Sequence, residues 1–211
     1  MTVSDALAAG PDGRLRCFWA VGGAPEYLAY HDEEWGRPAL GDRDLFERLT
    51  LEAFQSGLSW LTILRKREAF RAGFAGFDIP TVAAFGPDDV ARLLADAGIV
   101  RHRGKIEAAI GNARAALDVI AAEGSLATLC WRFEPVAGPA PIDGGDVAAT
   151  TPESVALSRE LKRRGFRFVG PTTVHAFFQA MGLVNEHLDG CWVRDEVEHE
   201  RAAVDRATLV G

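Results

Sequence analysis

Apolar residues recur every three or four positions along most of this chain, a spacing typical of helices with one buried face. No segment shows a convincing alternation of apolar and polar residues, the pattern expected of a half-buried strand. We therefore predict an all-α fold. The expected helices cover 26–34, 45–56, 61–74, 88–97, the segment from Ile106 to Leu117, 152–165 and 172–181.

A glutamate interrupts the buried face of the helix expected at 45–56. Asp42 or Asp44 can cap this helix, and its apolar residues share one side: Leu45, Phe46, Leu49 and Ala53. Glu52 falls on that same side. A buried carboxylate is costly unless it is paired, hydrogen-bonded or neutralised. Glu52 therefore indicates either a buried ion pair or a contact to a ligand, and the pattern alone favours neither.

Aromatic residues lie close to Glu52 in the sequence. Gly57 permits a turn directly after the helix, and this turn brings Trp60 near the carboxylate. On the preceding helix, Tyr27 and Tyr30 are three residues apart and can line one surface. Two core tyrosines with their hydroxyls at the edge are the commoner explanation of that spacing.

A short loop between two expected helices carries three cations. Gly98 can end the first helix in the left-handed conformation, and Arg101, Arg103 and Lys105 follow it. The glycines, of which Gly104 is the second, would let backbone N–H groups approach a phosphate. A plain helical hairpin with solvated arginines is the commoner arrangement.

Two cysteine and histidine pairs stand at opposite ends of the chain. His187 and Cys191 are four residues apart, so both could reach one cation from a single helical turn. Cys17 and His31 form a looser pair. Together they make a Cys₂His₂ set suited to tetrahedral zinc, and four protein ligands would leave no open position for a reactive water. Unrelated buried residues are the alternative.

Composition narrows the class of protein. The hydrophobic content of 48% supports a sizeable core, and the net charge of −7 argues against holding nucleic acid by bulk charge, so a polyanion would need a local basic patch. There is no apolar run of membrane-spanning length and no secretory signal. With three cysteines and no sign of a disulfide framework, we expect a cytoplasmic protein that does not bind membranes.

The pattern also predicts how the chain is divided. Residues 1–16 lack periodicity and are expected to be a flexible leader. Residues 17–192 should form the body, as two helical lobes joined by a Pro/Gly/Ala-rich linker within 124–149. The charged residues 193–211 should form a tail outside the core.

Five motifs in their order along the chain resemble the type I 3-methyladenine DNA glycosylases, an all-helical branch of the helix-hairpin-helix glycosylases. The resemblance extends from about Cys17 to Cys191. The motifs are Tyr-Leu-Ala-Tyr-His-Asp-Glu-Glu-Trp-Gly, Gln-Ser-Gly-Leu-Ser-Trp, Asp-Ala-Gly-Ile-Val-Arg-His-Arg-Gly-Lys-Ile, Lys-Arg-Arg-Gly-Phe-Arg-Phe-Val-Gly and Gly-Leu-Val-Asn-Glu-His-Leu-Asp-Gly-Cys.

The resemblance implies roles for most of the candidate residues. The base would be contacted by Glu52 and Tyr30, stacked on by Trp60, and enclosed by Trp19 and Tyr27. The gap in the duplex would be filled by Gln55 and Leu58. Apart from the resemblance, the basic hairpin itself leads us to predict that the DNA backbone is held by Arg101, Arg103, Gly104 and Lys105. A structural zinc, with no organic cofactor, would tie a small lobe built from both chain ends through Cys17, His31, His187 and Cys191.

The resemblance also implies the reaction. A monomeric enzyme would flip 3-methyladenine out of alkylated double-stranded DNA and hydrolyse its N-glycosidic bond, without lyase activity. Phe54 departs from the glutamine that some members carry beside the wedge, and the leader and tail are longer than expected. Two other classes stay open: a catalytically silent DNA-binding module that retains the hairpin, and a zinc hydrolase, which the fourfold protein ligation disfavours.

Overall fold

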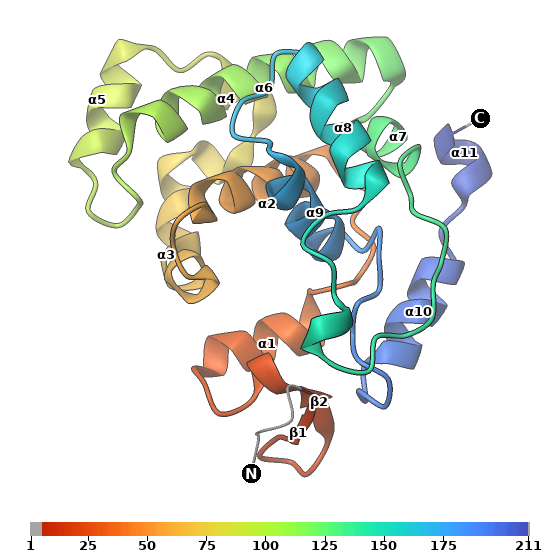
Figure 1. The fold of residues 1–211 in the computed structure, drawn as a ribbon. Coiled ribbons are helices and arrows are strands. Elements are labelled where there is room, and N and C mark those ends of the chain that lie inside the picture. The colour runs from red at the N-terminus through yellow and green to blue at the C-terminus, as the bar shows by residue number, and fades with distance from the viewer. Residues whose placement is uncertain (1–5, 211) are drawn as a thin grey trace.

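The computed structural model describes residues 6–210, and within them the chain is mostly helical (Figure 1). Its first half contains β1 (Leu7–Ala9), β2 (Leu15–Cys17), η1 (Phe18–Ala20), α1 (Pro25–Glu33), α2 (Asp42–Gln55), α3 (Trp60–Gly73), η2 (Ala75–Phe77), α4 (Ile79–Ala83) and α5 (Pro87–Ala95). Its second half contains α6 (Arg103–Glu123), α7 (Leu126–Trp131), η3 (Gly144–Asp146), α8 (Pro152–Arg163), α9 (Pro171–Ala180), α10 (Arg194–Ala202) and α11 (Arg206–Val210).

Helix α2 lies at the centre of the larger group of helices. It packs against α3, α6, α7 and α9, and its apolar residues join one continuous core with those of α3 to α9. Gly41 is its N-cap, so neither Asp42 nor Asp44 takes that position. Asp42 instead accepts a hydrogen bond from the Leu126 amide and thereby caps α7. The predicted helix is confirmed, but the capping residue is wrong.

A second, smaller core is built from both ends of the chain. It joins residues of β2, α1 and the segment after α9: Cys17, Tyr30, Trp35, Leu188, Cys191, Val193 and Val197. Figure 1 shows the red N-terminal elements on the far side of the molecule from α5 and α6. Trp60 packs against both cores, so it lies where the two meet.

The leader expected at 1–16 is partly ordered. Strands β1 and β2 pair antiparallel, with Leu7 opposite Cys17 and Ala9 opposite Leu15. Arg16 is buried and forms ion pairs with Asp12 and Asp32. Strands of three residues are too short to show a period-two pattern, which is why the sequence did not reveal them. Residues 1–5 of the expected leader lie outside the described part of the chain.

The C-terminal expectation was wrong in a similar way. Helix α10 is not a detached tail, because Val197 belongs to the smaller core and Arg201 is buried. Arg201 donates hydrogen bonds to the carbonyls of Gly182 and Leu183 and pairs with Glu134. The linker expected within 124–149 is likewise shorter, because α7 is helical through Trp131.

The hairpin between α5 and α6 is present, but its first helix ends earlier than expected. Helix α5 stops at Ala95, and Gly98 is not in the left-handed region. A Cβ on Gly98 would lie 2.8 Å from the Cβ of Ala69. Close packing against α3, rather than helix termination, therefore requires this glycine.

Candidate active site and metal cluster

A cavity of about 480 Å³ lies where the two cores meet. Four helical elements contribute half of its lining residues: η1, α1, α2 and the first turn of α3. Trp35, residues at η3 and α9, and the segment after α9 supply the rest. The lining residues include all five that the sequence analysis assigned to base binding: Trp19, Tyr27, Tyr30, Glu52 and Trp60. The fold thus brings together residues separated by up to 41 positions in the chain.

Glu52 is the unusual group in this wall. Its side chain is 5% exposed, yet among the described residues the carboxylate has neither an ion pair nor a hydrogen bond. Burial raises the pKa of Glu52 to about 8, since removal from water disfavours the charged form. The ion-pair alternative for Glu52 is therefore wrong, and its carboxylate faces the cavity.

Another glutamate on the same helix shows the contrasting arrangement. Glu47 is also buried, and it accepts hydrogen bonds from Arg67 (2.7 Å) and Arg71 (2.9 Å) on α3. The buried ion pair that the sequence left open for Glu52 thus exists one and a half turns away. Glu52 is five residues further along α2 and points to a different neighbour, the cavity.

The aromatic side chains around Glu52 make edge and tilted contacts. The rings of Tyr30 and Trp60 are 5.3 Å apart, and those of Trp19 and Tyr27 are 5.9 Å apart at 76°. The Tyr27 hydroxyl accepts a hydrogen bond from the Leu61 amide and so anchors the start of α3. Burial, followed by the nearby Glu52 charge, raises the pKa of Tyr30 well above its usual value, so its hydroxyl stays protonated.

Eight further lining residues were not assigned a role from the sequence, and four of them carry aromatic or polar side chains. Phe18 and Trp35 extend the aromatic wall, and Trp35 lies against Trp19 with the rings 5.0 Å apart. Gln179 and Glu186 also line the cavity, and the Gln179 amide donates to the Glu186 carboxylate. Trp35 lies within the first motif, but nothing in the sequence indicates that Gln179 faces the cavity.

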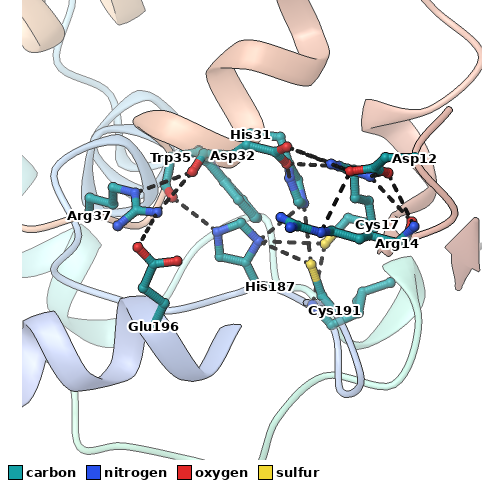
Figure 2. Close-up of polar contacts among 12 residues, drawn as sticks. Asp12, Arg14, Cys17, His31, Asp32, Trp35, Arg37, His187, Cys191 and Glu196 are labelled. Atoms are coloured by element: carbon teal, nitrogen blue, oxygen red, sulfur yellow. Dashed lines mark hydrogen bonds and ion pairs between the residues drawn. The ribbon is translucent and has the colours of Figure 1, made fainter. Parts of the chain in front are cut away.

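Cys17, His31, His187 and Cys191 form one buried cluster (Figure 2). Their ligand atoms all lie within 4.8 Å of one another. Nε2 of His31 is 3.2 Å from Nδ1 of His187, and Sγ of Cys191 is 3.5 Å from the first and 3.7 Å from the second. His187 and Cys191 lie in irregular chain on either side of the turn at Asp189 and Gly190, not on the single helical turn that the sequence suggested.

The surroundings orient both imidazoles toward the centre of this cluster. His31 Nδ1 lies 2.8 Å from Asp32 Oδ1, and His187 Nε2 lies 3.0 Å from the Trp35 carbonyl oxygen, so each nitrogen can donate there (Figure 2). The other nitrogen of each ring is then a lone-pair donor facing the two sulfurs. Burial lowers the pKa of His187, which favours this neutral form. The cluster could hold a metal ion.

The residues expected to enter the duplex lie at the rim of the cavity. Gly57 has a φ of 83°, as the predicted turn requires, and Leu58 beside it is 39% exposed. The Gln55 side chain donates a hydrogen bond to the Leu58 carbonyl and holds this turn in place. Leu58 is thus a large apolar side chain presented to solvent next to the entrance.

The hairpin lies beside this turn, and two of its three cations have partners: Arg103 forms an exposed ion pair with Glu107 (3.4 Å), and Lys105 is buried. Arg101 and Arg103 are exposed, whereas Lys105 is 8% exposed. Lys105 Nζ donates to the Phe54 carbonyl (2.9 Å) and to the Ser56 carbonyl (2.7 Å). The expectation that Lys105 contacts phosphate is therefore wrong, because its ammonium ties α6 to the end of α2. Gly104, in the first turn of α6, is partly exposed beside His102.

Fold and site together define a helical protein with an aromatic cavity, a separate Cys₂His₂ cluster, and a buried carboxylate, that of Glu52, which is unpaired within residues 6–210. The chain belongs to the methyladenine glycosylase family, whose model matches residues 19–195. It is 49% identical over 179 residues to DNA-3-methyladenine glycosylase 1 of Escherichia coli strain K12. The aligned region covers 83% of this chain and 95% of the relative.

Solved structures agree with this assignment. A crystal structure of 3-methyladenine DNA glycosylase I superposes with a TM-score of 0.80 at 47% identity, covering 84% of this chain and 98% of the other. A tyrosine-to-phenylalanine variant of 3-methyladenine DNA glycosylase I in complex with 3-methyladenine also gives a TM-score of 0.80, at 36% identity, covering 85% and 97%. The predicted family and the all-α fold class are confirmed.

Proposed function

We propose that this protein excises 3-methyladenine from alkylated DNA by hydrolysing its N-glycosidic bond, which leaves a free base and an abasic site. The observation that carries the proposal is Glu52, a buried carboxylate in an aromatic cavity that has no partner within the described part of the chain. Such a group is complementary to a flat, cationic ligand. Relatives of this chain are 3-methyladenine glycosylases, and one of the solved structures is in complex with 3-methyladenine.

The cavity residues divide the recognition of the base among them. Trp60 is the stacking surface, and base–aromatic stacking contributes about 1–3 kcal/mol per base. Glu52 and Tyr30 contact the polar edge of the adenine, while Trp19 and Tyr27 close the wall. The volume of about 480 Å³ lies within the range of small-molecule sites and accommodates one purine.

The chemistry demands little acid catalysis from the protein. Adenine methylated at N3 is cationic while it is joined to deoxyribose, so it is already a good leaving group. Ionised Glu52 gains both charge pairing and a hydrogen bond from this cation. Unmodified adenine carries no positive charge, so it cannot pair with the charge of the buried carboxylate. Recognition and rate enhancement therefore come from one contact. None of the residues that line the cavity is a lysine, which supports simple hydrolysis without a Schiff base.

The rim of the cavity supplies the contacts to DNA. Flipping a damaged base out of the stack costs a few kcal/mol, and Leu58 with Gln55 would fill the gap that the base leaves. Arg101, Arg103 and the backbone at Gly104 would hold phosphates, which position the protein without reading sequence. An acidic chain can bind DNA in this way because the contact is local.

We propose that the Cys₂His₂ cluster holds a structural zinc ion. Zinc bonds of about 2.0–2.3 Å to nitrogen and sulfur in a tetrahedron place ligand atoms about 3.3–3.8 Å apart. The separations of 3.2, 3.5, 3.7 and 3.8 Å among these four residues support that fit. The ion would tie β2 and α1 to the segment after α9, and its thiolates suit the reducing cytoplasm.

Release of free bases from methylated DNA, followed by chromatography, tests the proposed reaction. The wild-type protein should release 3-methyladenine, and DNA afterwards should carry abasic sites without strand breaks. Glu52→Gln is the matched variant, since it retains the shape of the side chain and removes the charge. A protein that binds methylated DNA but releases no base would instead be a silent DNA-binding module. Gel filtration of the same preparation should give a monomer.

A further inference from the structure

We propose that the turn at Arg167 and Phe168, between α8 and α9, is a second contact to the DNA backbone that acts with the hairpin. This inference rests on the proposed function, because its occupant is the DNA that carries the damaged base. Arg167 would pair with a phosphate, and the Phe168 ring would pack on the adjoining deoxyribose. Neither residue lines the cavity, so the turn would act on DNA binding and not on base recognition.

The backbone of Phe168 is held in a conformation that disfavours its own side chain. Its φ is 56°, in the left-handed region where residues other than glycine are uncommon. The ring is nevertheless 37% exposed, so burial of the ring does not account for the conformation. Unfavourable backbone geometry of this kind persists where the surrounding structure imposes it, and it occurs preferentially at functional sites.

Buried polar side chains impose the shape of this turn. Asn112, which is 2% exposed on α6, donates to the Arg167 carbonyl (3.0 Å) and accepts from the Arg167 amide (2.8 Å). Ser158 on α8 donates to the Val169 carbonyl (2.6 Å). The backbone on both sides of Phe168 is therefore fixed to two helices, and the turn presents its side chains rigidly.

The turn lies directly against the hairpin. The Phe168 ring is 6.2 Å from the His102 ring, and its tip would be 3.8 Å from a Cβ placed on Gly104. Both neighbours belong to the N-terminal end of α6, where backbone N–H groups favour an anion. The turn at Arg167 and Phe168 thus lies next to the hairpin. The hairpin in turn lies next to the turn after α2, to which Lys105 ties it.

The exposed positive charges on this surface favour a DNA strand as its partner. Arg101 and Arg167 are exposed, and neither forms an ion pair with any residue in the described part of the chain. Most other arginines of this acidic protein are paired, as Arg163 and Arg164 are with Glu160 on the neighbouring helix. Free guanidinium groups around an exposed ring match the alternation of phosphate and sugar along a DNA strand.

Three variants and one control test the proposal through equilibrium binding to a duplex with an abasic-site analogue, titrated over several salt concentrations. Arg167→Ala should weaken binding several-fold. It should also reduce the salt slope, the slope of log binding constant against log salt concentration, by about 0.9 in magnitude. Phe168→Ala and Phe168→Gly should each weaken binding about three- to tenfold. Arg43→Ala is the control, since Arg43 is exposed and without an ion pair among residues 6–210, but lies at the other end of α2.

The two Phe168 variants separate binding from folding. Glycine removes the ring and accepts the positive φ, so Phe168→Gly should melt no lower than Phe168→Ala, yet both should lose the same DNA affinity. Wild-type affinity and salt slope in Arg167→Ala, or wild-type affinity in both Phe168 variants, would overturn the proposal. Binding of free 3-methyladenine should stay unchanged in all of them. Failure of the proposed function would be distinguishable, because the wild-type protein itself would then release no base.

Discussion

Replacing Glu52 with glutamine should make the protein more stable at neutral and alkaline pH, although it removes a residue of the site. The folded-state pKa of Glu52 is about 8, against 4.5 when the group is solvated. Between these values the folded state binds more protons than the unfolded state, so the free energy of unfolding falls as pH rises. The group lowers stability by about 3 kcal/mol at pH 7, relative to acid solution.

Urea denaturation of both proteins at pH 5, 7 and 9 measures this effect. The wild type should lose about 4 kcal/mol relative to Glu52→Gln between pH 5 and pH 9, since only the wild type ionises at this position. Comparing the two proteins cancels the titration of the other groups. Equal pH dependence in the two, or a variant that is less stable at every pH, would refute the assignment of Glu52 as a buried carboxyl without a partner.

The same ionisation should govern excision. If the cationic base requires ionised Glu52, kcat/KM of the wild type should rise about tenfold from pH 6 to pH 7 and level off above about pH 8, since kcat/KM reports the free enzyme. Glu52→Gln should be slow at every pH. A wild-type profile that is flat over this range would show that the charge of Glu52 has no part in the reaction.

Glu47→Gln is the matched control on the same helix. Glu47 is also buried but paired with Arg67 and Arg71, and loss of its charge leaves the 12% exposed Arg67 side chain with Glu34 alone. Stability should therefore fall by about 3 kcal/mol, which is opposite in sign to the effect at Glu52. Excision by the folded Glu47→Gln protein should be unchanged.

The remaining predictions concern the metal and the hairpin. Cys191→Ser should lower zinc content from about one ion per chain and reduce the melting temperature. Cys130→Ser is the control, because it changes a buried thiol outside the cluster and should retain the ion. Full zinc retention in Cys191→Ser would show that Cys191 is not a ligand. Arg103→Ala should weaken binding to all DNA sequences alike and flatten the salt slope by about 0.9. An unchanged slope would show that Arg103 does not contact a phosphate. Lys105→Met should lower the free energy of unfolding by about 1–3 kcal/mol, because the buried carbonyl of Phe54 and the carbonyl of Ser56 lose their donor, and should leave the salt slope unchanged.

The sequence predicted seven of the eleven α-helices in residues 6–210, those whose apolar periodicity is regular, and it missed α4, α7, α10 and α11. It was less informative about how they end, since Gly98 serves close packing with Ala69 and not helix termination. It missed the pairing of β1 with β2 because strands of three residues are too short to show alternation. These differences share one cause: a contact with another part of the chain decides the local structure.

The candidate DNA surface shows the same limit at the level of single side chains. Arg103 and Lys105 are two residues apart in one basic motif, and composition cannot distinguish them. One is exposed at the start of α6, and the other turns inward to the carbonyls at the end of α2. The helical period separates them by about 200° around the axis, but only the position of α2 determines which of the two directions faces solvent.

Glu47 and Glu52 show most clearly what the fold adds to the sequence. Both are carboxylates buried on α2, and the sequence drew attention only to Glu52, because it alone interrupts the apolar side. Of the two explanations for a buried carboxylate, the ion pair occurs at Glu47, and a ligand contact is what we propose for Glu52. Helix α3 decides between them, since its arginines reach Glu47 while its first residue, Trp60, lines the same cavity as Glu52. An unpaired charge in a protein interior is unfavourable unless its partner arrives from outside, and here the cavity is open to that partner.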